Sequence, residues 1–286
     1  MSTDHGTRPR VDCTVDADGE ISFGLRPPPA DGPAHLLLRL RPRKGQPEKT
    51  LHRLPLEPAG GDRLAAVLGD RPALDEGRWD VYLVRDADGS RQRLRPGLRD
   101  LRALVDGQTR DRRSPVRVRI PYVTLDGFLA IRAWAREAHA EAAGVHMGDG
   151  AMTVTARLHG AVFGQGAAVR LRRRGGGPDR VVEPRIEEDQ RGFSFTADFT
   201  GPTAGASDGG CVWDVFVEPA AGTPPVRVGR LLDDVADRKN VFVLPSAPAG
   251  DVVVRPYYTV DNDLAVEAAP AVRDVSPDRP GMAGIL

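Results

Sequence analysis

Two pairs of aspartates are the first residues whose types and spacing could do chemistry. Asp80 returns as Asp214, and Asp126 returns as Asp261, at almost the same distance along the chain. Carboxylates can act as general acid and general base when two of them converge in one pocket. Asp80 and Asp126 recur together as Asp214 and Asp261, so each of these two sets would need a pocket of its own. Hydrogen bonding at turns and strand edges is therefore the favoured interpretation of all four residues.

Two arginine-rich turns could instead bind an anion. One is Arg41-Pro42-Arg43-Lys44-Gly45, and the other is Arg172-Arg173-Arg174-Gly175-Gly176. The forked guanidinium group suits phosphate and carboxylate oxygens, so the paired tips predict a grip on an anionic glycan polymer. A solvated turn is the alternative. A nucleotide cradle is not indicated, because the Lys-Ser/Thr end of a P-loop is missing. The predicted binding residues at the tips are Arg41, Arg43, Lys44, Arg172, Arg173 and Arg174.

Aromatic side chains offer a second way to bind a glycan. Tyr122, Tyr257 and Tyr258 follow prolines at equivalent places in the chain, and we expect them to be exposed and to contact sugar rings. Trp79 and Trp213 could also stack on sugars. They alternate in phase with valine and leucine, however, which favours burial in two cores.

Other site chemistries find little support in the sequence. His139, His146 and Asp149 do not have the spacing of a closed zinc site. There is no Gly-x-Ser-x-Gly elbow, no Gly-x-Gly-x-x-Gly after a strand and no His-Glu-x-x-His helix. The sequence therefore predicts no catalytic residue, no metal and no cofactor. A transferase with an unrecognised site between two domains stays open as the enzyme alternative.

The stretch 85–119 contains eleven arginines and five aspartates. This excess could bind the acidic face of a partner or an anionic polymer. Within it, Arg117 and Arg119 alternate with Val116, Val118 and Ile120, so we expect the two arginines on the solvent face of a strand. Aromatic residues do not interleave with the arginines, which argues against nucleic acid as a partner.

Composition narrows the class of protein. The chain has 286 residues, 40% of them hydrophobic, with 40 cationic and 40 acidic side chains; 37 of the cations are arginine. The start is polar, and no apolar run reaches the ~20 residues of a membrane span. Cys13 and Cys211 occupy non-equivalent places, so no disulfide is expected. These features predict a cytoplasmic protein.

An internal duplication organises these residues. The phrase Trp79-Asp80-Val81-Tyr82-Leu83 is echoed by Trp213-Asp214-Val215-Phe216-Val217, and Pro121-Tyr122-Val123-Thr124-Leu125-Asp126 by Pro256-Tyr257-Tyr258-Thr259-Val260-Asp261. Upstream of these phrases, Leu38-Arg39-Leu40-Arg41 is aligned with Val169-Arg170-Leu171-Arg172. Short segments of alternating hydrophobicity between Gly and Pro turns predict an all-β fold of two tandem Ig-like antiparallel β-sandwich domains.

The duplication also sets the expected boundaries. They are a disordered start (1–10), a first sandwich (11–136), a linker (137–145), a second sandwich (146–270) and a flexible tail (271–286). The alanine-rich segment 133–143 favours a helical turn within the linker. Short helices are expected at 98–105 and 231–236.

The two repeated phrases together resemble the accessory β-sandwich modules of actinobacterial glycosyltransferases and CDP-glycerol glycerophosphotransferases. The resemblance spans roughly 11–270 as two modules in tandem. It implies a role in cell-surface polysaccharide synthesis of the teichoic-acid type, beside a transferase partner, and it supplies no catalytic residue. Three hypotheses follow: association with such a transferase, direct glycan binding, and transferase activity of the chain itself.

Overall fold

The chain folds almost entirely into β-strands, with one short helix among the described residues. The computed structural model describes residues 9–26, 33–42, 45–48, 50–85, 89–201 and 210–271. The prediction of an all-β antiparallel sandwich fold is confirmed. Arg43 and Lys44 lie outside the described residues. Of the predicted start (1–10) and tail (271–286), the structure describes only residues 9, 10 and 271.

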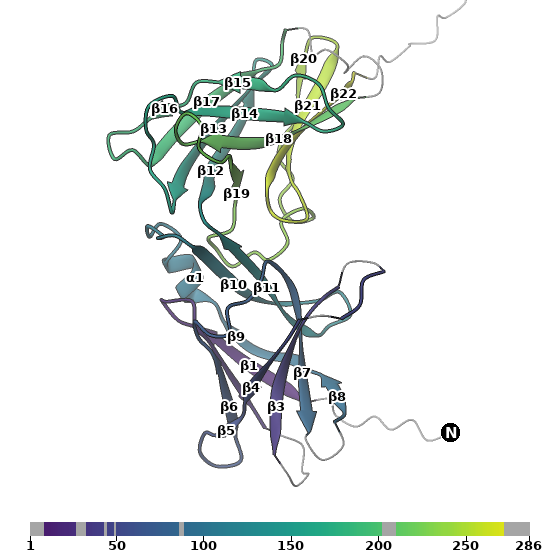
Figure 1. The fold of residues 1–286 in the computed structure, drawn as a ribbon. Helices are drawn as coiled ribbons and strands as arrows, with labels where there is room; N and C mark the ends of the chain where they lie inside the picture. Colours follow the sequence, from purple (N-terminus) through teal and green to yellow (C-terminus); the bar gives the residue numbers. More distant parts are fainter. Residues whose placement is uncertain are drawn as a thin grey trace, which may run out of the picture.

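The first half of the chain forms two sheets, seen in the lower part of Figure 1. One has the strand order β5-β6-β2-β1-β9. The other has the order β10-β11-β7-β3-β4, with β8 paired to β7. The elements are β1 (Arg10–Val15), β2 (Ile21–Leu25), β3 (Ala34–Leu40), β4 (Leu51–Pro55), β5 (Glu57–Pro58), β6 (Leu64–Leu68), β7 (Gly77–Arg85), β8 (Arg91–Arg93), β9 (Arg95–Asp100), α1 (Arg102–Asp106), β10 (Val116–Val123) and β11 (Leu129–Arg136).

The second half repeats this pairing with two differences, one of which is that β20 pairs with β21 where the first half has no strand beside β10. β19 runs parallel to β12 and antiparallel to β18, so it joins the two layers into one hydrogen-bonded path. The strands are β12 (His139–Gly148), β13 (Ala151–His159), β14 (Ala168–Arg173), β15 (Arg180–Val182), β16 (Arg185–Ile186), β17 (Gly192–Asp198), β18 (Cys211–Glu218), β19 (Val226–Gly229), β20 (Ala247–Ala249), β21 (Val252–Tyr258) and β22 (Leu264–Pro270).

The two repeated tryptophans anchor the two cores, as their alternation predicts. Trp79 is 0% exposed and Trp213 is 3% exposed. Trp79 packs with Val81 and Leu83 in the first core, and the second core contains Trp213 with its own alternating valines. Burial of such large apolar side chains is the main stabilising contribution in each half.

The strand pairing corrects the alignment of the two copies by two residues. In the first half Leu40 pairs with Trp79, and in the second half Arg173 pairs with Trp213. Arg41 therefore corresponds to Arg174 rather than to Arg172. The next backbone hydrogen bond along the strand supports this alignment. The N–H groups of Arg41 and Arg174 donate to equivalent carbonyl groups of β7 and β18, each with an N···O distance of 2.8 Å.

The predicted helices are corrected in three places. Segment 133–143 contains the end of β11 and the start of β12, so the predicted linker is largely strand. The helix expected at 98–105 is α1, which begins only at Arg102 because Leu98 belongs to β9. Segment 231–236 forms bends and no helix. Pairing with neighbouring strands overrides the helical propensity of alanine.

The two halves meet through a shared apolar cluster. Leu231, Leu232 and Ala236 of the second half pack into the core cluster of the first half. Val118 and Trp134 pair directly across β10 and β11, so both side chains lie on the outer face of that sheet, where the second half covers them. Figure 1 shows β10 and β11 at this junction.

A buried carboxylate holds the segment that makes this contact. Glu141 accepts hydrogen bonds from the backbone N–H groups of Leu231 (2.7 Å) and Leu232 (3.1 Å), and it contacts His139 Nε2 at 2.7 Å. Burial opposes the charge of Glu141, but the contact with His139 and the two N–H groups outweigh it and hold its pKa below the ordinary value. The junction is thus fixed from within the second half.

Two further features concern the cysteines and the possibility of a membrane-spanning helix. Cys13 and Cys211 are free and buried. None of the helices in the described part of the chain has the length and apolar character needed to span a bilayer.

Candidate binding sites at the two basic tips

Asp80 organises the tip of the first half. It lies on the outer face of β7 opposite Trp79 and is 3% exposed. Arg41 donates from Nε (2.9 Å) and Nη2 (2.7 Å), Arg39 Nη2 donates over 2.8 Å, and Arg93 Nη2 lies at 3.4 Å. Burial opposes ionisation of Asp80, but the bonds from Arg41 and Arg39 outweigh it and lower its pKa.

Asp214 organises the tip of the second half in the same way. Arg174 donates from Nε (3.1 Å) and Nη2 (2.7 Å) to the two carboxylate oxygens of Asp214, and Arg227 Nη1 lies 3.2 Å from it. Burial again opposes ionisation, and Arg174 with Arg227 lowers the pKa of Asp214. The recurring aspartates are therefore ion-pair centres that orient arginines.

Aromatic rings complete both clusters. The Arg39 guanidinium lies 5.3 Å from the centroid of Tyr82, and in the second half Arg172 and Arg227 each lie 4.7 Å from the centroid of Phe216. Tyr82 and Phe216 are equivalent residues, so the cation–π contact survives the loss of the hydroxyl group.

The predicted tyrosines separate into two groups. Tyr122 and Tyr257 are partly buried on the outer faces, and Tyr257 Oη lies 3.4 Å from Arg174 Nη1. Tyr258 is 3% exposed in the second core, so its prediction as an exposed binding residue is wrong. Successive residues of a strand point to opposite faces, and Tyr257 occupies the outer one.

The first tip borders a cavity, and the second tip contacts Tyr257, which lines another. The first, of about 560 Å³, is lined by Arg41, Pro42, Arg132 and Asp261 among others. The second, of about 300 Å³, is lined by Tyr257 together with Phe242, Pro256, Lys239, Arg255 and Glu267. Glu267 of β22 is the equivalent of Arg132 of β11, so the two cavities have one equivalent position in their linings.

The other predicted tip residues contribute less. Arg172 is exposed above Phe216 and lies 4.0 Å from Asp179. Arg173 is partly buried, and its side chain packs near Gly177 within the turn.

The predicted solvent face of β10 is confirmed for Arg117, which is exposed, and is wrong for Arg119. Val116, Val118 and Ile120 point outward and are buried against the second half, while Arg119 turns inward and donates to the backbone carbonyls of Gly19, Leu68 and Gly69. The residues alternate as expected, but contact between the two halves buries the face that a single sandwich would expose.

The residues of the weak metal pattern lie in different environments. His139 is 0% exposed and contacts Glu141, whereas His146 and Asp149 are exposed. His159, which is not part of that pattern, accepts the backbone N–H of Arg112 at Nδ1 over a distance of 3.2 Å. Within the described ranges no group of three His, Cys, Asp or Glu side chains could hold a metal ion.

Sequence reasoning missed Arg39, Arg93 and Arg227. Arg93 pairs with Tyr82 and Arg227 with Phe216, so these two arginines recur at the same spacing as the two tryptophans. This repeated spacing could have identified Arg93 and Arg227 from the sequence.

Comparisons with known proteins give no family. No family model matches the chain, and no curated protein matches it. Among solved structures, S. aureus TarS is 16% identical with a TM-score of 0.28, over 65% of this chain and 35% of that chain. Residues 217–571 of S. aureus TarS give the same identity and TM-score over 66% and 55%. A marsupial T cell receptor is 7% identical with a TM-score of 0.26, over 92% of both chains. The chain thus spans about a third of the full TarS chain, and TM-scores of this size do not establish a common fold.

Proposed function

We propose that the chain is a non-catalytic binding protein of two β-sandwich modules, 11–136 and 146–270, that holds an anionic cell-surface glycan. The observation that carries this proposal is the duplicated tip. In both halves an aspartate on the outer sheet face clasps the tip arginine, Arg41 or Arg174, beside a cavity or beside a tyrosine that lines one.

The clasp suits binding because it fixes the arginine before a ligand arrives. Arg41 uses Nε and Nη2 for Asp80, and its Nη1 makes no hydrogen bond to a described residue. Arg174 uses the same two nitrogens for Asp214, and its Nη1 makes a long hydrogen bond of 3.4 Å to Tyr257 Oη, which a ligand oxygen would replace. A guanidinium held in this way loses little side-chain entropy when its free edge meets a phosphate or carboxylate oxygen.

The second cavity adds the apolar surface that sugar rings need. Phe242, Pro256 and Tyr257 supply apolar and aromatic walls, Lys239 supplies positive charge, and Arg255 is paired with Glu267. Ring stacking with nearby cations suits a polymer of alternating sugar and anionic groups.

Two tips on one chain favour a repeating ligand. Occupation of the first tip raises the effective concentration of the polymer at the second, provided that the polymer spans both. This bivalency, together with the resemblance of the repeated phrases to modules of surface-polymer transferases, supports a place in the synthesis of a teichoic-acid-like polysaccharide beside a transferase partner.

Titration calorimetry with purified teichoic acid tests the proposal, with dextran as the neutral comparison. We expect binding to teichoic acid that weakens steeply with salt. The double variant Arg41→Gln, Arg174→Gln should bind roughly tenfold or more weakly, because each site loses a charge-assisted hydrogen bond.

The matched control is Arg53→Gln, Arg185→Gln, which removes two exposed arginines that have no ion-pair partner within 4.0 Å in the described chain. Thermal unfolding of both double variants separates loss of binding from loss of fold. Salt-insensitive binding, or equal affinity of the two double variants, would contradict the proposal.

A further inference from the structure

A third cavity lies away from the tips, beside the junction of the two halves. It has a volume of about 190 Å³ and is lined by the β1–β2 turn, α1, the start of β10 and Leu232. Its apolar floor is formed by four buried side chains, those of Leu104, Val116, Val118 and Leu232. Leu232 comes from the second half, so the cavity is complete only when the two halves are docked.

One side of this cavity is cationic without carboxylate partners. Arg112, Arg113, Arg117 and Arg119 line it, and none lies within 4.0 Å of a carboxylate among the described residues. The contrast with the tips is clear, since Arg41 and Arg174 are each clasped by an aspartate. The four arginines are therefore held here without a direct ion pair among the described residues.

Burial adds to the cost of this charge. Arg119 satisfies its guanidinium with backbone carbonyls only, and burial lowers its pKa. Burial, with repulsion from Arg110, also lowers the pKa of Arg112, whose Nε is buried without a hydrogen-bond partner. An anion in the cavity would relieve both penalties.

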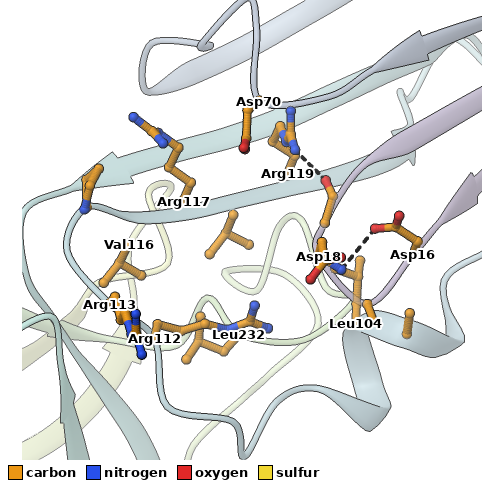
Figure 2. Close-up of a pocket in the computed structure, with 15 residues that line it drawn as sticks. Asp16, Asp18, Asp70, Leu104, Arg112, Arg113, Val116, Arg117, Arg119 and Leu232 are labelled. Carbon is orange, nitrogen blue, oxygen red and sulfur yellow. Dashed lines mark hydrogen bonds between the residues drawn. The ribbon is translucent and has the colours of Figure 1, made fainter.

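The opposite side is acidic. Figure 2 shows Asp16 and Asp18 across the cavity from Arg112 and Arg113, with Asp70 beside Arg119. Asp16 Oδ1 accepts the backbone N–H groups of Asp18 (2.9 Å) and Glu20 (2.8 Å), which fixes the turn. The side chains of Asp18 and Asp70 make no hydrogen bond or ion pair within 4.0 Å in the described chain. Free carboxylate oxygens accept hydrogen bonds from hydroxyl groups.

We infer that this cavity binds a small sugar phosphate, with the phosphate on the side lined by the four arginines and the sugar hydroxyls toward Asp18. The carbon skeleton lies over the apolar floor. At ~30 Å³ per water molecule the cavity holds roughly six waters, which suits a pentose-sized ligand better than a nucleotide. The site shares no residue with the two tips and does not depend on the proposed glycan binding.

Calorimetry on the full chain with ribose 5-phosphate, inorganic phosphate and ribose tests the inference. Ribose 5-phosphate should bind at least tenfold more tightly than either of the other two, because only it engages both sides. Arg113→Gln, Arg117→Gln should reduce its affinity at least tenfold. These two side chains are exposed, so the fold should be unaffected. Asp18→Asn should reduce the preference for ribose 5-phosphate over inorganic phosphate.

The Arg53→Gln, Arg185→Gln protein serves as the control and should bind ribose 5-phosphate like the wild type. Arg41→Gln, Arg174→Gln should do so as well, which separates this site from glycan binding. The inference is overturned if ribose 5-phosphate gives no binding at millimolar concentration, if inorganic phosphate binds equally well, or if the Arg113 and Arg117 substitutions change nothing.

Discussion

Replacing Asp80 by asparagine should destabilise the protein far more than the equivalent change at Asp214. The Asp80 side chain is 4% exposed and faces three arginines, whereas that of Asp214 is 20% exposed and faces two. Asparagine keeps the shape but removes the charge, so Arg39, Arg41 and Arg93 would remain beside one another with their shared counter-ion lost.

The size of the effect follows from burial. Removing one partner of a buried ion pair costs about 3–5 kcal/mol, so Asp80→Asn should lower the free energy of unfolding by that amount. Asp214→Asn should cost about 1–3 kcal/mol, the range for hydrogen bonds to charged groups that stay partly solvated. Urea denaturation followed by tryptophan fluorescence measures both, because Trp79 and Trp213 report on the two cores.

The pH dependence gives a second check. The folded-state pKa of Asp80 lies below the ordinary value of 3.8, because the bonds from Arg41 and Arg39 outweigh the effect of burial. Its contribution is therefore complete above pH 3.8 and is lost as the pH falls through the lower, folded-state pKa. The stability difference between wild type and Asp80→Asn should shrink in that acidic window and stay constant above it. Equal losses for the two variants, or a difference that grows on acidification, would refute the ion-pair reasoning.

Four further outcomes are expected. Burial, with repulsion from His139, lowers the pKa of His159 from 6.5 to about 4. As the pH falls, the unfolded chain therefore binds the proton before the folded chain does. The free energy of unfolding should fall by about 3 kcal/mol at most between pH 6.5 and 4, and His159→Gln should remove this dependence. Burial raises the pKa of Cys13 to about 12, so the thiol should resist iodoacetamide at about pH 8 until the protein is unfolded. Glu141→Gln should cost about 1.5–3 kcal/mol and increase proteolysis near Leu231, because it weakens the acceptor of two N–H groups. In teichoic acid titrations, Arg174→Gln should reduce affinity more than Arg41→Gln, because Asp261 borders only the first tip's cavity.

The sequence was sufficient for the strands but not for their register. Period-two alternation places Trp79 and Trp213 inside, and they are inside. The same alternation is unchanged by a slip of two residues, so it could not distinguish Arg172 from Arg174 as the partner of Arg41. Backbone pairing decides between them.

Two other errors have different physical causes. Segment 133–143 is rich in helix formers, yet Ala133 and Ala140 are small residues at fully buried strand positions. Tertiary packing selected them for size, and propensity scales cannot register that. Arg119 turns inward, because the second half covers the opposite face of the sheet, where Val118 and Trp134 lie, and no pattern within a single sandwich encodes that contact. Tyr258, by contrast, was predictable, since two adjacent strand residues cannot share a face.

The hairpin turn that recurs in the two halves, at Asp126 and at Asp261, makes different contacts in each half. In the second half its turn faces the first half: Asp261 pairs with Arg132 at 2.6 Å, and its carbonyl accepts Trp134 Nε1 at 3.1 Å. In the first half the equivalent Asp126 pairs with Arg93 of its own module. Docking thus places a carboxylate at the cavity beside Arg41, while in the second tip's cavity Lys239 and Arg255 outnumber Glu267. If the chain binds an anionic polymer as proposed, the polymer should meet a more favourable field at the second tip and bind there first.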